Sequence, residues 1–156
     1  MGRMRTRTGF SLVELIVVIV VMAILIGIAA PRFFGQGDFE GPAFAQELAS
    51  AARYAQKIAV VSGCPVNLVV TASGYSLFKP QDTNPKCSGA LAMTLPVVHP
   101  ATGDPFAAST PAGVTIGGTL GTVQFAASGL PDAAASFTVG TQAVTITAGS
   151  GYVTVQ

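Results

Sequence analysis

Apolar residues follow three patterns along the chain, and each pattern predicts a different element. First, residues 10–30 form an apolar run of 21 residues in which Glu14 is the only ionisable side chain. Second, residues 44–59 place apolar side chains at three- and four-residue spacings, which is typical of one helix face. Third, from Val66 onward, turn residues separate short runs rich in β-branched and aromatic residues, which is typical of antiparallel strands. The patterns predict an α+β fold, with a long N-terminal helix packed on an antiparallel β-sheet domain.

The borders between these patterns divide the chain into four segments. We expect a basic N-terminal segment (1–9), a transmembrane helix (10–30), a helical continuation with kinks (31–63) and a globular β-sheet domain (64–156). At about 1.5 Å per residue, the apolar run is long enough to cross a hydrocarbon core of about 30 Å. Glycines and prolines between residues 31 and 42 indicate the kinks, and Pro42 suits the first turn of the next helical piece.

The expected elements of the globular part follow directly from the pattern. The predicted helix face consists of Phe44, Leu48, Ala51, Ala55, Ile58 and Ala59. The predicted strands are Val66–Thr71, Tyr75–Phe78, Leu91–Val98, Val114–Ile116, Thr122–Ala126, Ser136–Val139, Ala143–Thr147 and Tyr152–Val155. Two turn-rich stretches, residues 80–89 and 99–111, are expected to be loops.

Charge is distributed unevenly, and the distribution predicts a topology. Residues 1–9 carry three arginines and no acid, whereas residues 35–156 carry four basic and six acidic side chains. Because basic flanks stay in the cytoplasm, we expect the N-terminus inside and the C-terminal domain outside. From Pro96 to the C-terminus there is no Lys or Arg. This argues against nucleic-acid binding, because contacts to phosphates need cations.

Two common kinds of N-terminal segment explain the apolar run only in part. A secretory signal peptide would explain the basic start, and Ile28-Ala29-Ala30 loosely resembles its cleavage site. The run is longer than such signals usually are, however, and Pro31 would follow the cut, where its missing N–H suits a peptidase badly. A plain membrane anchor would explain the length and the arginines but not Glu14.

A third kind is indicated by Gly9-Phe10-Ser11-Leu12-Val13-Glu14, between the basic segment and the apolar run. This motif resembles the class III signal of type IV pilins and pseudopilins. The resemblance implies that a prepilin peptidase removes residues 1–9 by cutting between Gly9 and Phe10. It also implies that the same enzyme methylates the new N-terminus, so that the mature chain begins with N-methylphenylalanine at Phe10.

Glu14 needs a reason to lie in an apolar segment, because a carboxylate at the centre of a bilayer costs about 2.5–3.5 kcal/mol on insertion scales. Pairing with an α-amine would recover much of this cost. The amine of Phe10 is four residues away on the same helix face, and the amine of an adjacent subunit is available in a filament. The resemblance implies the second pairing, in which Glu14 aligns each incoming subunit during assembly. The alternative is that Glu14 merely rests near the membrane surface.

The rest of the chain extends the resemblance to one branch of the family. Val123-Gln124-Phe125 followed by Ser128-Gly129, with a closing strand at 152–155, resembles the H-type pseudopilins and their minor-pilin relatives. The phrase Ala51-Ala52-Arg53-Tyr54-Ala55, leading to Ser62-Gly63-Cys64-Pro65, more narrowly resembles a minor pilin of the mannose-sensitive haemagglutinin (MSHA) pilus.

The resemblance implies a structural, minor subunit of a type IV pilus that supports adhesion and pilus biogenesis. The alternatives are an H-type pseudopilin of a type II secretion system, and a ligand-binding minor pilin. Such a minor pilin would bind DNA through a basic exposed tail, or a glycan through aromatic side chains such as Tyr75, Phe78 and Tyr152. The implied partners are other pilin or pseudopilin subunits, the prepilin peptidase, an inner-membrane assembly platform and, before assembly, the lipid bilayer. The implied location is the bacterial inner membrane as a single-pass protein, and then the pilus or pseudopilus.

The two cysteines, Cys64 and Cys87, both lie in the part expected outside the cytoplasm. An oxidising compartment favours a disulfide between them, which would tie the loop of residues 80–89 to the end of the helix. The alternative is a pair of reduced, buried thiols.

No arrangement of residues indicates catalysis, a metal or a cofactor, so we expect a protein that is not an enzyme. His99 has no acidic neighbour in sequence, and one histidine does not make a triad or a metal cluster. Asp104 and Asp132 adjoin proline- and glycine-rich turns and are expected to form turns. The glycine-rich stretch Gly117–Gly121 lacks the lysine and the spacing of a phosphate-binding loop.

Overall fold

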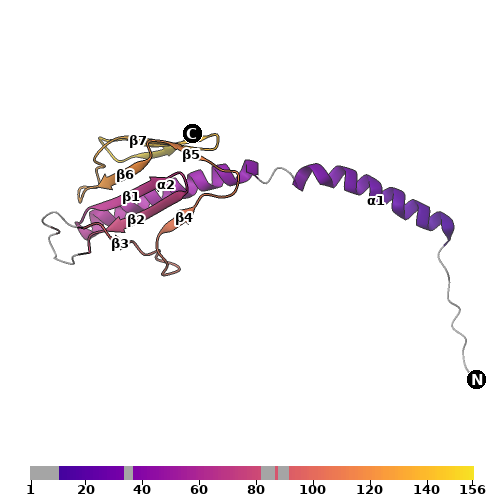
Figure 1. The fold of residues 1–156 in the computed structure, drawn as a ribbon, viewed down its shortest axis with the longest axis horizontal. Coiled ribbons are helices and arrows are strands. Elements are labelled where there is room, and N and C mark those ends of the chain that lie inside the picture. Colours follow the sequence, from indigo (N-terminus) through magenta and orange to yellow (C-terminus); the bar gives the residue numbers. More distant parts are fainter. Residues whose placement is uncertain (1–10, 34–36, 82–86, 88–91) are drawn as a thin grey trace, which may run out of the picture. The chain divides into compact units, whose positions relative to one another are not determined.

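A computed structural model describes residues 11–33, 37–81, 87 and 92–156, with the side chains of these residues except 27–33, 37 and 38. The chain divides into two units, Met1–Gln36 and Gly37–Gln156, which are described separately (Figure 1). Among the described residues, the first unit contains helix α1 (Leu12–Phe33), and the second contains helix α2 (Gly37–Ser62) and nine strands. Within the described part of the chain, no helix is both long enough and apolar enough to cross a membrane.

The strands of the second unit form two antiparallel sheets. Their bounds are β1 (Val66–Thr71), β2 (Gly74–Lys79), β3 (Leu95–Pro96), β4 (Ala107–Ser109), β5 (Ile116–Gly118), β6 (Gly121–Phe125), β7 (Ala135–Val139), β8 (Gln142–Ile146) and β9 (Val153–Val155). The five-stranded sheet has the order β3-β2-β1-β6, and β4 also pairs with β2. The four-stranded sheet has the order β5-β7-β8-β9. Helix α2 packs against strands of both sheets.

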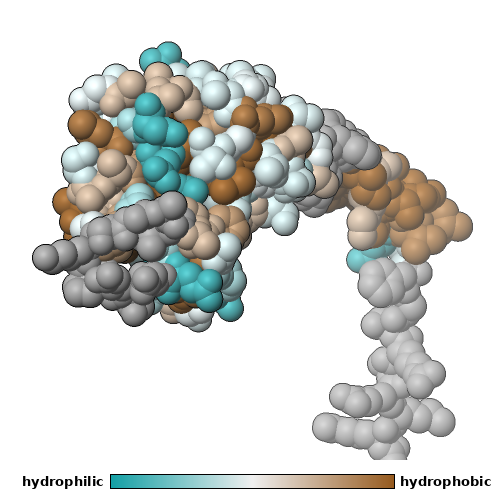
Figure 2. All heavy atoms as spheres, turned by 60° about the vertical axis from the view of Figure 1, so that its left-hand side comes forward, coloured by the Kyte–Doolittle hydropathy of each residue, from teal (hydrophilic) through white to brown (hydrophobic). Residues whose placement is uncertain are grey.

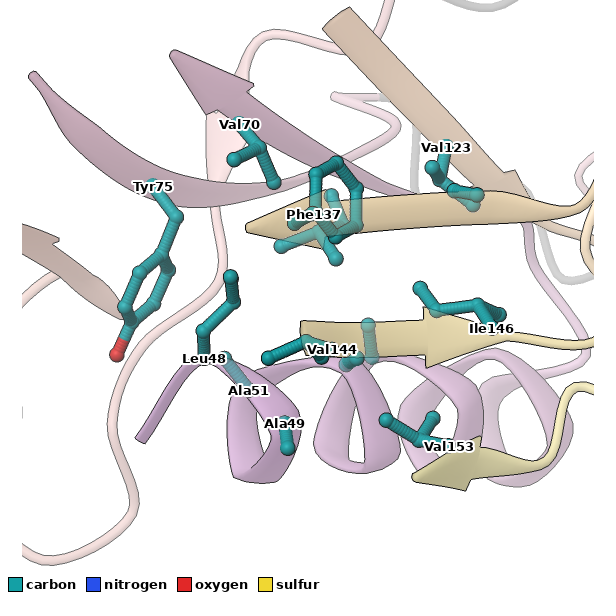
Figure 3. Packing of buried hydrophobic residues seen from close by; sticks show 14 of the residues in the cluster. Leu48, Ala49, Ala51, Val70, Tyr75, Val123, Phe137, Val144, Ile146 and Val153 are labelled. Carbon is teal, nitrogen blue, oxygen red and sulfur yellow. The ribbon is translucent and has the colours of Figure 1, made fainter. Parts of the chain in front are cut away.

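The core lies between α2 and the inner faces of the two sheets. Alternation along the strands directs every second side chain inward, as in β7, where Ala135, Phe137 and Val139 are buried. The side of α2 that faces the sheets consists mainly of alanines, which allow the strands to approach the helix closely. Leu48 is the large side chain among these alanines. Figure 3 shows Leu48 on the side of the helix and Phe137 on a strand, both among the buried hydrophobic residues of this core.

Most of the predicted elements are confirmed, with small shifts at their ends. The predicted helix face is buried at Phe44, Leu48, Ala51, Ala55 and Ala59, and Ile58 packs against the core while partly exposed. Strand β1 has the predicted bounds, and β2, β6, β7, β8 and β9 differ from the prediction by one residue at one or both ends.

Three predictions in the globular part are wrong. Helix α2 begins at Gly37, so Pro42 lies in its second turn and not in its first. The expected strand at residues 91–98 is reduced to β3, of two residues. The expected loop at residues 99–111 contains strand β4, whose sequence, Ala-Ala-Ser, has little strand propensity and forms an edge strand because it pairs with β2. The expected kinks between residues 31 and 42 fall partly on residues 34–36, outside the described residues, and stay a prediction.

Strand β5 begins two residues later than predicted and includes Gly117 and Gly118. Glycine is a poor strand former, so the sequence pattern misses this extension. A Cβ at Gly117 would lie 2.8 Å from Oγ1 of Thr138 on β7. At Gly118, which has a φ of 89°, a Cβ would overlap the backbone oxygen of Ser136, so the pairing of β5 with β7 depends on a glycine at this position.

Candidate functional site

The apolar surface of α1 is the most unusual feature of the described chain. Its large apolar side chains between Leu12 and Ile26 are all exposed, from 47% at Ile16 to 73% at Leu12. The surface of α1 that carries colour in Figure 2 is almost entirely brown, the colour of hydrophobic residues. A helix that is apolar on every side is stable only when lipid or protein covers it.

Glu14 lies in the first turn of α1 and is the acidic residue of that turn. A negative charge at this end of a helix interacts favourably with the helix dipole. Ser11 directly precedes the helix, and its backbone carbonyl accepts the hydrogen bond of the Leu15 amide at 3.2 Å. Ser11 and Glu14 therefore have the spacing of a capping box, in which a serine and a glutamate satisfy free amides at the helix start. The capping-box spacing is visible in the sequence, so Glu14 has a reason to lie at the helix start in addition to the assembly role that the resemblance implies.

The predicted processing residues, Gly9 and Phe10, lie outside the described residues. The predicted cleavage and methylation therefore stay predictions. The pairing of Glu14 with an N-terminal amine also stays a prediction, because the amine would belong to Phe10 and Phe10 lies outside the described residues.

Cys64 and Cys87 form a disulfide, as expected from the sequence, with their Cα atoms 5.4 Å apart. This separation is within the usual range for a disulfide. Cys64 lies two residues beyond the end of α2. The bond fixes a residue of the connection between β2 and β3 beside the end of the helix, which is the role expected for it.

The C-terminal strand is fastened to α2 by two polar side chains, a contact that we call the C-terminal clasp (Arg53, Gln56, Gly129, Ser150 and Val153). The Arg53 guanidinium donates a hydrogen bond to the backbone oxygen of Val153 at 3.0 Å. The Gln56 amide nitrogen donates to the backbone oxygens of Gly129 at 2.9 Å and of Ser150 at 3.1 Å. The clasp thus brings together two stretches that carry the sequence resemblance, around Arg53 and around Gly129.

Two glycines make the clasp possible. Gly129 and Gly151 both have a positive φ, 82° and 67°. A Cβ on Gly129 would lie 2.8 Å from Cγ2 of Val60, and a Cβ on Gly151 would overlap the Gln56 amide and lie 2.8 Å from the oxygen of Gly129. Sequence reasoning noted Gly129 only as part of a motif and missed Gly151, because neither residue carries a side chain that suggests an interaction.

The remaining candidate residues, Asp132, His99 and Asp104, lie in turns and a hairpin that hydrogen bonds with the backbone stabilise. Asp132 forms a turn, as predicted, because its carboxylate accepts hydrogen bonds from the amides of Gln124 and Ala133 at 3.1 and 2.9 Å. His99 and Asp104 lie in the hairpin between β3 and β4, where the His99 amide donates to the Asp104 backbone oxygen at 2.7 Å. Among the described residues, no group of three or more His, Cys, Asp or Glu side chains could hold a metal.

The three aromatic residues considered for sugar stacking do not form one surface. Tyr75 is only 5% exposed and belongs to the core, and Phe78 is partly buried on the same strand. Tyr152 is 66% exposed, next to the clasp. Burial and negative charge both disfavour the ionised form of Tyr75, so its surroundings, with the Glu47 carboxylate, raise the pKa of its hydroxyl above the usual range. A glycan platform that includes Tyr75 is therefore ruled out.

Two family models match the sequence. Residues 45–156 match the family described as type II transport protein GspH, and residues 4–30 match the prokaryotic N-terminal methylation motif. No curated protein sequence matches the chain. The narrower resemblance to an MSHA minor pilin is not tested by these matches and stays a prediction.

Solved structures with a similar fold are a minor pilin and a minor pseudopilin. The type IV minor pilin FimU of Pseudomonas aeruginosa is 16% identical, with a TM-score of 0.55 over 79% of this chain and 92% of that chain. The minor pseudopilin EpsH from the type 2 secretion system of Vibrio cholerae is 12% identical, with a TM-score of 0.54 over 75% of this chain and 96% of that chain. At these identities the likeness shows the fold alone, and it confirms the predicted combination of an N-terminal helix with an antiparallel β-sheet domain.

Proposed function

The chain belongs to the family of type II transport protein GspH, and from this premise we propose that it is a minor structural subunit of a type IV pilus. Together with the methylation motif, the family makes it a type IV pilin-like protein that assembles with other pilin or pseudopilin subunits. The observation that carries the proposal is α1, whose exposed side chains from Leu12 to Ile26 are nearly all apolar. Such a helix needs a bilayer first and neighbouring helices afterwards.

The proposed route begins in the inner membrane. The 21-residue apolar run spans the bilayer once, with the arginines of residues 1–9 in the cytoplasm and the disulfide-bonded domain outside. The prepilin peptidase cuts between Gly9 and Phe10 and methylates the amine of Phe10. This cut removes three positive charges that hold the segment at the cytoplasmic surface. The inner-membrane assembly platform then moves the subunit from the bilayer into the filament, where α1 packs in the core.

Glu14 guides this step in the proposal. Its carboxylate lies in the first turn of α1, close to where the mature chain begins. In the filament the Glu14 carboxylate pairs with the N-terminal amine of an adjacent subunit, and this pair sets the axial position of the incoming subunit. An unpaired carboxylate in this apolar setting is costly, so the pair forms only in the correct register.

A second candidate function is that of an H-type pseudopilin in a type II secretion system, and the description of the matching family favours it. Processing and packing of α1 would be the same in both systems. No catalytic role is proposed. A role in binding nucleic acid is not proposed either, because the chain from Pro96 on lacks Lys and Arg.

The test is intact mass measurement and N-terminal sequencing of this chain in filaments sheared from cells. We expect a chain that starts at methylated Phe10 and is lighter by two hydrogens because of the disulfide. The same mature chain found only in the membrane fraction would favour the secretion pseudopilus. A chain that still begins before Gly9 in cells with active prepilin peptidase would refute the proposal.

A further inference from the structure

The face of α2 that is turned away from the two sheets carries a stripe of exposed residues. The exposed positions recur at intervals of four and three residues, at 39, 43, 46, 50, 53, 57 and 60. Any helix that is buried on one side shows exposure at this spacing, which is also the heptad spacing of helices that pack along each other. The residues that occupy the stripe decide whether another helix can pack there.

The two ends of the stripe are apolar, whereas its middle is polar. Phe39 at the start of α2 is 80% exposed, and Val60 and its neighbour Val61 at the end of α2 are 53% and 75% exposed. Between these ends the stripe includes the cations of Arg53 and Lys57. Burial of large apolar side chains is favourable, so each end offers a contact surface that the described part of this chain does not fill.

The apolar surface at the end of α2 continues onto the sheet domain. Val60 lies against Gly129, where a Cβ would be 2.8 Å from Cγ2 of the valine. The next residue, Leu130, lies in the connection between β6 and β7 and is 43% exposed. We call this surface the valine end (Val60, Val61 and Leu130).

Two copies of α2 that lie parallel, with their stripes facing, match apolar with apolar residues at one heptad shift. Phe39 and Val60 are 21 positions apart, so a shift of three heptads, about 32 Å, sets Phe39 of one copy against Val60 of the other. Without a shift, Arg53 and Lys57 would each face the same cation of the other copy, which is unfavourable. A shift of one or two heptads would set Phe39 against Gln46 or Arg53.

The charges beside the two ends favour the same shift. Glu40 follows Phe39 directly, and Lys57 lies one turn before Val60 on the stripe. In the shifted pair, the Glu40 carboxylate and the Lys57 ammonium belong to different copies and are four helix positions apart, about 6 Å along the axis. Long side chains can bridge this distance. Exposed ion pairs are weak, so the pair selects the shift while the apolar contact holds it.

We propose that the valine end binds Phe39 of a second copy of this chain, with the two α2 helices parallel and shifted by three heptads. This inference rests on the proposed function, because subunits that all leave one membrane in the same direction keep their α2 helices parallel. The two contacting surfaces differ, so the contact repeats along an open filament and does not close a dimer.

The contact is too small to hold two copies together by itself. A few side chains bury much less than the roughly 1,200 Å² of a stable interface. Packing of α1 in the filament core supplies the high effective concentration at which such a weak contact forms. The contact must therefore be measured in assembled filaments.

The test places the photoreactive residue p-benzoylphenylalanine at position 39 of the full-length chain in cells. Sheared filaments are irradiated, and mass spectrometry locates the cross-links. We expect a dimer of this chain, cross-linked from position 39 to residues 57–61 or to Leu130. The matched control has the same photoreactive residue at Gln46, which the shift places opposite Asn67, beyond the end of α2. It should give no cross-link to α2 of a second copy.

Variants then test each part of the contact. Val61→Asn should lower the yield of cross-linked dimer about three- to tenfold, because it removes apolar surface from the valine end. The control Val98→Asn changes a valine that is 49% exposed in the hairpin between β3 and β4, and should leave the yield unchanged. Glu40→Lys and Lys57→Glu should each lower the yield about two- to fivefold, and the variant with both changes should restore it.

The outcomes separate this inference from the proposed function. Equal yields for Val61→Asn and the wild type overturn the valine end as the binding surface. A double charge exchange with no better yield than the single variants overturns the shift. Cross-links from position 39 to lipid or to a different pilin, with this chain present in filaments, overturn the second copy and leave the proposed function intact. A wild-type chain absent from filaments and from the membrane-bound assembly refutes the proposed function itself.

Discussion

Gly151 is the position where a single methyl group should most disturb the globular unit. The residue is buried and has a φ of 67°, and the C-terminal clasp closes directly around it. In Gly151→Ala, the left-handed backbone conformation costs about 1–2 kcal/mol. The new Cβ also overlaps the Gln56 amide and lies 2.8 Å from the oxygen of Gly129. Gln56 must move, and it then loses its hydrogen bonds to Gly129 and Ser150.

Two lost hydrogen bonds contribute about 0.5–1.5 kcal/mol each. With the backbone strain, Gly151→Ala should lower the free energy of unfolding by about 2–5 kcal/mol. The chain offers a matched control in Gly113, which has a φ of 83° but has no atom within 4 Å of its would-be Cβ. Gly113→Ala should therefore cost the backbone strain alone. The difference between the free energies of unfolding of the two variants, about 1–3 kcal/mol, gives the contribution of the Gln56 hydrogen bonds in the clasp.

The assay is urea unfolding of the full chain in a non-ionic detergent, followed by the near-ultraviolet circular dichroism of its tyrosines. Gln56→Ala should cost about 1–3 kcal/mol alone, and Gly151→Ala should cost less in that background because one of its two clashes is gone. If Gly151→Ala is no more destabilising than Gly113→Ala, the clasp does not hold the C-terminal strand, and the reasoning from close approach is wrong.

Three further predictions concern α1, the disulfide and the buried tyrosine. Glu14→Ala should be processed normally but appear in sheared filaments in reduced amounts, as measured by immunoblotting against total mature chain; normal incorporation would remove its assembly role. Reducing the bond between Cys64 and Cys87 should lower the free energy of unfolding by about 3 kcal/mol, from the entropy of the loop that the bond closes; urea titrations with and without reductant test this. Because the pKa of Tyr75 is raised in the folded state, the unfolded chain loses this proton first above about pH 10, so stability should fall as pH rises beyond that point. Tyr75→Phe should remove this part of the fall, and an unchanged pH profile would contradict the assigned pKa.

The elements that the sequence predicts well are those whose own side chains determine them. Strand β1 alternates Val66, Leu68 and Val70 on its buried face, and this alternation is visible in the sequence. The buried face of α2 is equally visible, because its apolar residues repeat at helical spacing. In such elements the local pattern and the tertiary burial agree, so the pattern is sufficient.

The elements that the sequence misses are determined by their neighbours. Strand β4 is a strand because β2 offers it an edge, and β5 extends to Gly118 because it pairs with β7, whose backbone passes too close for a side chain there. The hydrogen bond from Tyr75 to Glu47 is invisible in the sequence for the same reason, since only the packing of α2 with β2 brings together two residues that are 28 positions apart. The motif before α1 is different, because it is read by a peptidase as sequence, and it can be recognised without any fold.

The clasp also determines when the domain can finish folding. The hydrogen bond from Arg53 to Val153 joins residues 100 positions apart, and that from Gln56 to Ser150 joins residues 94 positions apart. Strand β9, which lies far from α2 in the sequence, provides part of the cover of the helix. The helix face stays incompletely covered until β9 has been synthesised, and such distant contacts form slowly. A chain that lacks the segment from Gly129 to Val153 therefore leaves Arg53 and Gln56 without these hydrogen-bond acceptors, and its helix face stays open to water and to other chains.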